Sequence, residues 1–345
     1  MANEQLFAGG RLDSVTVAGG TPTEVTTAAA FDSSYADAAI LLTSPSDAVT
    51  ATFQTVSGGV LAASDIVSGE TLYCHFDYVW LGVLTAVNLN MMAFYDSSGF
   101  PWFAIRTSTG TTGQHGYYYN SNTGASPTWT QLGISDTWTQ NARRTYDVVL
   151  TIGSPHTVTV NINGSAVYSG TFTQASLTTL RNVRFSCIQS GSQTSAHSQI
   201  LCTRGISTIG AKVKTARATG AGTNAGFTSG AFTNVNEAIN SDVTADSSST
   251  AAQKQSYAMA DVTVPAGYTI GAVWHWLRAK NDGAAPSNLK SLIRGGGTDY
   301  QTANLSGIGT SFAPVGYRYD TDPNTSAAWT QAGWNAAEAG YASAT

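Results

Sequence analysis

Regular alternation along residues 157–162 is the feature that most restricts the fold of this chain. Threonine and asparagine alternate there with valine and isoleucine, as in a strand with one buried and one exposed face. The dipeptide Asn163-Gly164 follows, and a second short strand-like run begins at Ser165. A type I′ turn needs positive φ at both central residues, and Asn-Gly supplies it. This segment therefore predicts a β-hairpin with a two-residue turn.

Other segments repeat this pattern at short spacing. Residues 91–96 and 101–106 flank the turn residues Ser97-Ser98-Gly99, which predicts a second hairpin, and residues 183–187 alternate again. The one helix that we expect is short and covers residues 330–340. Closely spaced strands without ten-residue helical patterns between them are typical of β-sandwiches.

Composition supports this conclusion. Charged residues make up 11% of the chain, whereas an ordinary soluble domain has about 25%. A solvated amphipathic helix normally carries Lys and Glu on its outer face, but Glu occurs only at five positions, namely Glu4, Glu24, Glu70, Glu237 and Glu338. We therefore predict an all-β fold made of two β-sandwich domains of the jelly-roll kind.

The 345 residues suffice for two domains. Residues 1–30 contain few bulky side chains and predict an N-terminal arm or edge strand, which either frays or docks on a neighbouring subunit. Residues 31–208 form the expected first sandwich, and residues 209–345 form the second. Residues 220–226 are rich in Gly and Ala and are interpreted as a linker or long loop.

Charge and hydropathy disfavour several partners. The formal net charge is -5, and Arg143-Arg144 is the only basic doublet, so no nucleic-acid partner is expected. No stretch approaches the ~20 apolar residues of a membrane span. The first residues lack the pattern of a secretory signal, so we expect folding in a reducing cytoplasm. Cys74, Cys187 and Cys202 then act as small buried residues, and a Cys187–Cys202 bridge is disfavoured.

Catalytic patterns are weak throughout. A retaining glycosidase needs two carboxyls ~5–5.5 Å apart, which on one strand means acidic residues two positions apart, and no convincing strand has them. None of the five histidines lies near a nucleophile elbow, and the triglycine at residues 295–297 is not followed by Lys-Ser or Lys-Thr. We therefore expect no enzymatic activity, no catalytic residue and no cofactor.

The sequence is compatible with two kinds of ligand, a calcium ion and a glycan or protein partner. Calcium prefers loop carboxylates, and four loop aspartates qualify, although each one alone favours an Asx-turn: Asp96, Asp136, Asp320 and Asp322. Aromatic side chains also gather around a segment rich in short polar residues, and these form a candidate surface for a glycan or a protein partner. Its residues are Tyr117, Tyr118, Tyr119, Trp129 and Trp138, with Tyr118 expected to point away from its two neighbours.

Two resemblances add to this picture. Residues 144–150, the hairpin around Asn163-Gly164 and residues 180–185 resemble concanavalin A-like (laminin G-like) jelly rolls over about residues 25–206. The opening at residues 7–14, with residues 31–33, 296–300, 322–324, 328–330 and 334–336, is similar to structural proteins of phages and prophages. One departure is Trp334, where a smaller aliphatic residue is expected.

The resemblance implies a virion component, assembled in the host cytoplasm, and no reaction. We expect a homo-oligomer, a trimer in our first hypothesis, that decorates or cements the capsid or forms part of a head or tail fibre. Its partners would then be its own copies and other capsid or tail proteins. The alternative is a carbohydrate-binding receptor-recognition module of the tail that binds a host surface glycan. A polysaccharide depolymerase is the least favoured hypothesis.

Overall fold

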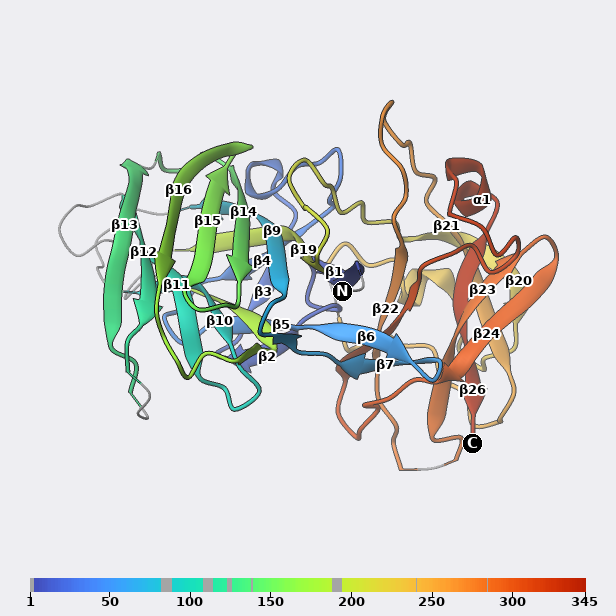
Figure 1. Cartoon of the computed structure of the whole chain (residues 1–345). Coiled ribbons are helices and arrows are strands. Elements are labelled where there is room, and N and C mark those ends of the chain that lie inside the picture. Colours follow the sequence, from blue (N-terminus) through green and yellow to red (C-terminus); the bar gives the residue numbers. More distant parts are fainter. Residues whose placement is uncertain are drawn as a thin grey trace. The chain divides into compact units, whose positions relative to one another are not determined.

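The chain is almost entirely β-structure in the computed structural model, which describes residues 3–81, 89–107, 114–122, 126–137, 139–187, 194–239, 241–283 and 285–345 (Figure 1). All strand pairs among these residues are antiparallel, and the all-β class is confirmed. Contacts divide the chain into two units. The first is Met1–Thr55 with Ala63–Val213, and the second is Val56–Ala62 with Lys214–Thr345.

The first unit is a sandwich of two large sheets. The eight-stranded sheet has the order β16-β15-β14-β9-β19-β4-β3, with β1 also paired to β19. Its strands are β1 (Glu4–Gly9), β3 (Thr23–Val25), β4 (Ala39–Leu42), β9 (Thr71–Trp80), β14 (Arg144–Thr151), β15 (His156–Ile162), β16 (Ser165–Phe172) and β19 (Ser195–Arg204). 

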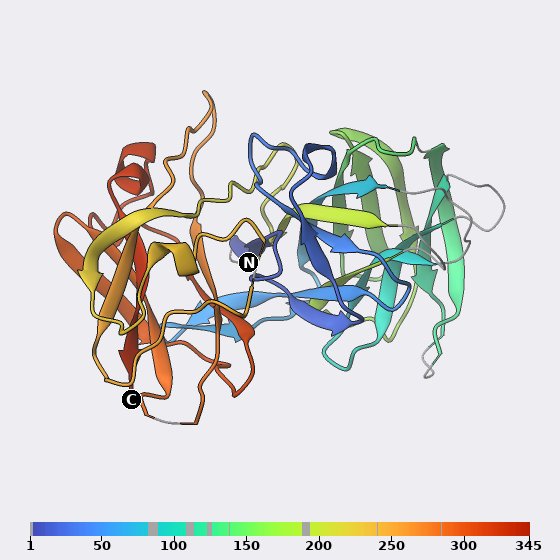
Figure 2. The same ribbon diagram turned by 180° about the vertical axis from the view of Figure 1, so that it is seen from behind.

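The seven-stranded sheet has the order β13-β12-β11-β10-β18-β5-β2. Figure 2 shows the same ribbon diagram from behind. Its strands are β2 (Thr16–Gly19), β5 (Ala48–Thr52), β10 (Asn90–Tyr95), β11 (Pro101–Thr107), β12 (Gln114–Asn120), β13 (Trp129–Thr137) and β18 (Asn182–Ser186). Smaller elements are β6 (Gln54–Ser57), β7 (Val60–Ala63), β8 (Ile66–Val67), β17 (Thr179–Leu180) and the 3-10 turn η1 (Ala28–Ala30).

Aromatic rings join the two sheets. Phe76 of β9 lies edge-on to Phe185 of β18, with ring centroids 5.0 Å apart, and stacks on Tyr146 of its own sheet at 5.2 Å. All three side chains are buried. Burial of such a side chain contributes about 1.5–3 kcal/mol. This apolar contact is what holds the sheets face to face.

Both predicted hairpins are confirmed. The strands β15 and β16 are joined by Asn163 and Gly164 at φ 51° and 81°, with Ile162 opposite Ser165. The strands β10 and β11 are joined through a turn in which Asp96 Oδ1 accepts hydrogen bonds from the backbone N–H groups of Ser98 and Phe100. Side-chain chemistry of the turn residues therefore sets both registers.

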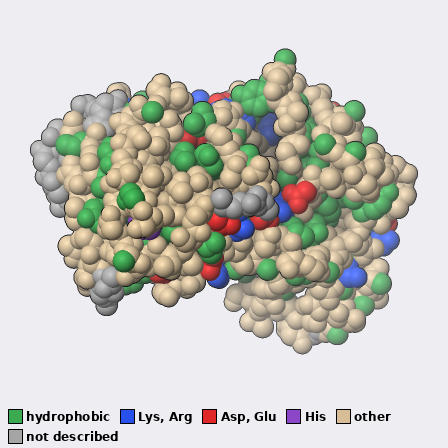
Figure 3. Space-filling model, viewed as in Figure 1, with side chains coloured by type: hydrophobic (Ala, Val, Ile, Leu, Met, Phe, Trp, Pro, Cys, Tyr) green, Lys and Arg blue, Asp and Glu red, His purple; other side chains and the backbone are tan. Residues whose placement is uncertain are grey.

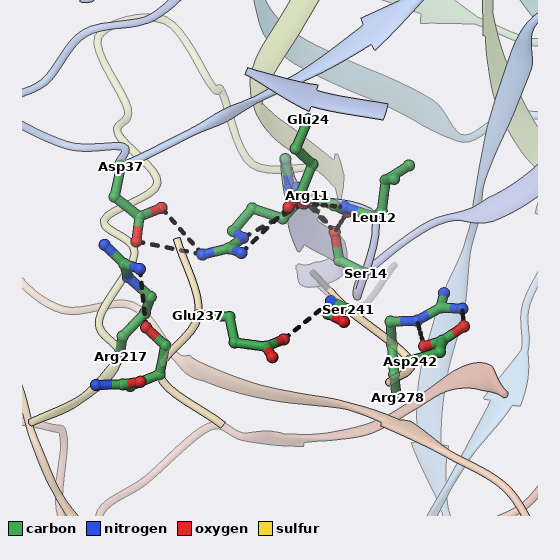
Figure 4. Close-up of polar contacts among 12 residues, drawn as sticks. Arg11, Leu12, Ser14, Glu24, Asp37, Arg217, Glu237, Ser241, Asp242 and Arg278 are labelled. Carbon is green, nitrogen blue, oxygen red and sulfur yellow. Dashed lines mark hydrogen bonds and ion pairs between the residues drawn. The ribbon is translucent and has the colours of Figure 1, made fainter. Parts of the chain in front are cut away.

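The N-terminal residues form strands of the sandwich, and β2 and β3 are the last strands of their sheets, which is the edge-strand alternative for residues 1–30. Strand β1 pairs with β19, β2 pairs with β5, and β3 pairs with β4. Arg11 fixes the segment between β1 and β2, because its guanidinium is buried against Glu24 at 3.2 Å and Asp37 at 3.3 Å (Figure 4). Glu24 also accepts a hydrogen bond from the backbone N–H of Leu12. A buried, doubly paired arginine of this kind makes the segment part of the sandwich.

The cysteines are free and buried, as expected. Cys202 of β19 lies opposite Cys74 of β9, with the two Sγ atoms 3.4 Å apart. The neighbour of Cys202 is therefore Cys74, and the Cys187–Cys202 pair considered from the sequence is not the pair that the sheet brings together.

The second unit has a five-stranded sheet in the order β20-β21-β26-β23-β24 and a two-stranded sheet of β22 and β25. Its elements are β20 (Ala218–Ala225), β21 (Lys254–Met259), β22 (Val273–Ala279), β23 (Asn288–Gly295), β24 (Thr298–Asn304), β25 (Ala313–Tyr319), β26 (Glu338–Ala344), η2 (Phe232–Asn234) and α1 (Gln331–Asn335). Its largest apolar cluster contains Trp329 and Trp334, whose rings lie 6.0 Å apart. The unexpected Trp334 therefore fills the core.

Two local predictions in the second unit are wrong. Residues 220–225 belong to the edge strand β20, and a Cβ at Gly222 would lie 2.6 Å from the backbone carbonyl carbon of Ser256, so glycine is needed where these two strands approach. The helix predicted for residues 330–340 ends at Asn335, since Glu338 begins β26 and pairs with Arg294 and Ala258. Sheet pairing therefore overrides the local pattern in both places.

We predict that acid destabilises the first unit through its buried histidines. Burial lowers the pKa of His115 and of His197 to about 3. An unfolded histidine titrates near ~6.5, so between about pH 6.5 and 3 the unfolded chain binds more protons than the folded chain. The free energy of unfolding should therefore fall as pH falls, by ~1.4 kcal/mol per pH unit for each histidine.

Thermal unfolding between pH 7 and pH 4 measures this slope. His197→Leu is the matched variant, because neither ring nitrogen of His197 has a hydrogen-bond partner among the described residues. We expect a shallower decline for the variant than for the unmodified chain. Equal slopes for the two proteins would contradict the assignment.

Candidate functional site

The predicted aromatic surface divides between the core and the outside of the sandwich. Tyr117 is fully buried against Tyr168 of the opposite sheet at 5.1 Å, and Tyr119 stacks on Phe172 at 5.0 Å. Tyr118 points to the other side of the sheet, as the alternation of β12 requires. Trp129 is half-buried, and Trp138 lies outside the described residues.

The predicted surface is therefore corrected at two positions. Tyr117 belongs to the core because it faces the eight-stranded sheet, and Tyr118 keeps only 4% exposure because Arg106 lies over its ring. The prediction of a glycan or partner surface now rests on Trp129 and on neighbours that the sequence analysis did not name. These neighbours lie on the outer face of the seven-stranded sheet.

One row of side chains crosses this outer face. Arg184 of β18 is opposite Ala93 of β10, which is opposite Ala104 of β11, and the row continues to Tyr118 of β12 and Gln131 of β13. Directly opposed residues share one face of a sheet. The two alanines in the middle are 0–1% exposed, although the eight-stranded sheet packs against the opposite face. Longer side chains from either side of the row must therefore cover them.

Arg106 provides cover on one side of the alanines. It follows Ala104 by two residues on β11 and so points to the same face. Its guanidinium carbon is 5.3 Å from the centroid of the Tyr118 ring and 5.0 Å from that of the Trp129 ring. Both are cation–π distances. Trp129 also packs against the cluster that contains the alanines.

Arg184 and Tyr95 provide cover on the other side. The Arg184 guanidinium carbon lies 4.4 Å from the centroid of the Tyr95 ring, and Asn182 of the same strand is opposite Tyr95. Burial raises the pKa of the Tyr95 hydroxyl, while contacts with Arg184 and Asn90 oppose that shift. We call this group the arginine–aromatic face: Tyr95, Arg106, Tyr118, Trp129 and Arg184. The two tyrosine rings are buried beneath it, and Arg106, Arg184 and Trp129 are its partly exposed members.

The electrostatics of this face are one-sided. The strands β5, β10, β11, β12 and β18 contain no Asp or Glu, whereas Arg106 and Arg184 both lie on their outer face. Burial lowers the pKa of Arg106, and the cause of opposite sign is the nearby Tyr118. In the described part of the chain Arg184 forms no ion pair. These strands therefore supply positive charge and hydrogen-bond donors, and they supply no carboxylate for general acid–base chemistry.

The calcium candidates have local roles instead. Asp96 closes the β10–β11 turn and accepts a hydrogen bond from Trp102 Nε1, and Asp320 pairs with Arg318 at 2.8 Å. Asp322 accepts hydrogen bonds from its own turn at Asn324 and Thr325, and the side chain of Asp136 lies outside the described residues. Among the described residues, no group of three His, Cys, Asp or Glu side chains is placed to hold a metal ion. No helix in the described part of the chain is long and apolar enough to cross a membrane.

The glycine in β12 sets the position of Tyr118. A Cβ at Gly116 would lie 2.4 Å from Tyr118 Cε2, so the tyrosine ring lies along its own strand over Gly116. This orientation brings the ring beneath Arg106. Sequence reasoning could have found Gly116 from the spacing Gly116-x-Tyr118, but it gave no sign of the register that adds Arg106 and Arg184.

We predict that Gly116→Ala displaces the Tyr118 ring and lowers the free energy of unfolding by about 1–3 kcal/mol through overpacking. Urea denaturation followed by circular dichroism measures this loss. Gly220→Ala is the matched control, because a Cβ at Gly220 meets no atom within 4 Å. The interpretation fails if the two alanine variants are equally stable.

Comparison with known proteins gives structural likeness alone. No family model matches the chain, and no curated protein matches it. Solved structures that resemble it include an endo-β-1,4-glucuronan lyase from the fungus Trichoderma reesei, with 12% identity and a TM-score of 0.39 over 56% of this chain and 93% of that one. A carbohydrate esterase of the Shiga toxin-encoding bacteriophage phi24B shares 16% identity, with a TM-score of 0.39 over 59% of this chain and 99% of that one. The receptor-binding domain of a botulinum neurotoxin C/D mosaic serotype shares 11%, with a TM-score of 0.40 over 57% of this chain and 47% of that one.

Proposed function

We propose that this chain binds carbohydrate through the arginine–aromatic face. The observation that carries the proposal is the position of the Arg106 guanidinium, 5.0 Å from the ring of the half-exposed Trp129 and 5.3 Å from that of Tyr118. The C–H face of a sugar packs on an aromatic ring, and its hydroxyls take hydrogen bonds from planar, fixed donors beside that ring. Arg106 beside Trp129 supplies both parts of this arrangement.

Two neutral amide side chains beside the face add hydrogen-bond donors and acceptors for sugar hydroxyls. Gln131 is exposed at one end of the row, and Asn182 lies at the other end beside Tyr95. The Asn182 Oδ1 atom is buried and has no hydrogen-bond partner among the described residues. A buried acceptor of this kind gains from a donor, and a sugar hydroxyl is a donor of suitable size.

The face lies on paired strands, which hold a binding site more rigidly than mobile loops do. The row residues belong to β18, β10, β11, β12 and β13, whose pairing fixes their spacing before a ligand arrives. A preformed site loses less conformational entropy on binding than a mobile one. The guanidinium of Arg106 is already held by its two aromatic neighbours, which reduces that cost further.

Trp129→Ala tests the proposal. We expect the unmodified chain to bind on a glycan array, and we expect the variant to lose about tenfold or more in affinity for the glycan so identified, because the sugar loses its aromatic contact. Isothermal titration measures the affinity, and the thermal midpoint shows whether the variant is folded. Tyr268→Ala is the matched control, since Tyr268 is an aromatic residue of the second unit that is 45% exposed. Equal binding by Trp129→Ala and the unmodified chain would exclude this face as the site.

We also propose that the chain is a non-enzymatic structural subunit of a bacteriophage particle, in which the glycan-binding face would serve receptor recognition. The surface supports this second proposal, because neutral polar side chains and backbone dominate the face seen in Figure 3. Sparse charge lowers the desolvation cost when subunits pack together. The phage-like motifs at the two ends of the chain point in the same direction.

For this second proposal we expect a homotrimer that is present in purified particles. Light scattering coupled to gel filtration gives the mass, and quantitative mass spectrometry of purified virions gives the copy number. Hundreds of copies would indicate capsid decoration, and a handful would indicate a tail or neck position. A monomer at all concentrations that is missing from particles would overturn the proposal.

A further inference from the structure

We infer that the glycan bound by the arginine–aromatic face is an acidic polysaccharide, recognised through its carboxylates by Arg184 and Arg106. This inference rests on the proposed carbohydrate-binding function and adds the chemical class of the ligand. Its basis is the charge of the face. Five neighbouring strands, β5, β10, β11, β12 and β18, carry two arginines on their outer face and contain no acidic residue, and the edge strand β13 beside them contains one aspartate, Asp136, whose side chain lies outside the described residues.

Most other arginines of this chain have a carboxylate partner, which distinguishes them from Arg184. Arginine forms ion pairs with carboxylates at Arg11, Arg143, Arg181, Arg204, Arg278, Arg294 and Arg318. Arg184 instead lies over the Tyr95 ring and beside the small side chain of Ala93, and it forms no ion pair in the described part of the chain. Arg184 also contacts the Tyr95 hydroxyl. A guanidinium that lies over an aromatic ring can still make a planar bidentate contact with its remaining N–H groups, which is the geometry that a carboxylate prefers.

Burial adds a second reason. Arg106 is half-buried against two aromatic rings, and burial lowers its pKa. A positive charge that has lost part of its water gains more from an anion than an exposed one does. Arg106 therefore contributes most when an acidic group of the ligand reaches the face.

The spacing of the two arginines fits a polymer. Arg184 and Ala104 are separated by two strand spacings, so their Cα atoms lie about 10 Å apart, and Arg106 is two residues further along β11. Arginines with Cα atoms this far apart can each contact a separate carboxylate of one ligand. The spacing of the two arginines matches carboxylates on different sugar units of one polysaccharide chain, which would cross the Ala93–Ala104 pair between them.

A polysaccharide is favoured over a nucleic acid. A protein that tracks a phosphate backbone places many Lys and Arg along its groove. Here the face has two arginines and no lysine in these strands, and the whole chain has a formal net charge of -5. Single-stranded DNA is therefore the rival ligand that the experiment must include.

Isothermal titration of the full chain tests the inference with three pairs of probes. Polygalacturonate, alginate and hyaluronan are each compared with the same polymer after its carboxylates have been reduced to primary alcohols, and a thymidine oligonucleotide is the fourth ligand. We expect at least one native polymer to bind about tenfold or more tightly than its reduced form, with affinity that falls as salt is added. We expect Arg184→Met to lose most of that preference and Arg106→Met to reduce it further.

Arg181→Met is the matched control, because Arg181 carries the same charge at the start of β18 but is already paired with Asp65 at 2.9 Å. It should keep the preference for the acidic form, and all variants should keep their thermal midpoints within a few degrees. Equal binding of native and reduced polymers would overturn carboxylate recognition while leaving carbohydrate binding intact. Binding of none of the polymers, or of the oligonucleotide alone, would overturn both.

Discussion

The two-sided burial of the central strands in the seven-stranded sheet is the constraint on which the first unit depends. Side chains of a strand alternate between its faces, yet β10 and β11 are buried at nearly every position. Their inner side chains, such as Phe94 and Phe103, lie in the core between the sheets. In the described part of the chain, long side chains of the same sheet pack over their outer alanines.

That requirement explains why arginine and aromatic residues lie together on the outside of the sandwich. Arg106 and Arg184 extend their methylene stems over apolar surface and keep their guanidinium groups near its edge, and aromatic rings hold them there. Covering the alanines and holding two positive charges in place are thus one and the same packing arrangement. A substitution that loosens the cover also moves the charges, which couples the stability of the sheet to the geometry of the proposed binding face.

Sequence alone predicts the parts of this molecule that depend on neighbours along the chain. The Asn163-Gly164 turn and the Asp96 turn follow from the backbone conformations that these residues favour. The fate of residues 220–226 does not, because their strand exists only where Glu338 and Ser256 meet it from distant segments. The candidate face cannot be predicted from local sequence for the same reason. Alternation predicts that Tyr118 points away from Tyr117 and Tyr119, but Arg184 joins it through three successive strand pairings that no local pattern encodes.

The charge of the face is likewise a property of several strands and of no single motif. In a chain with 16 basic and 21 acidic residues, carboxylates are numerous enough to pair with most arginines. Arg11 is one example, since it is buried between Glu24 and Asp37, and an arginine satisfied in this way is part of the framework. Arg184 differs because its own strand β18 and the strands β5, β10, β11 and β12 lack Asp and Glu. The positive character of the face therefore arises from the joint composition of five strands that only the folded sheet brings together.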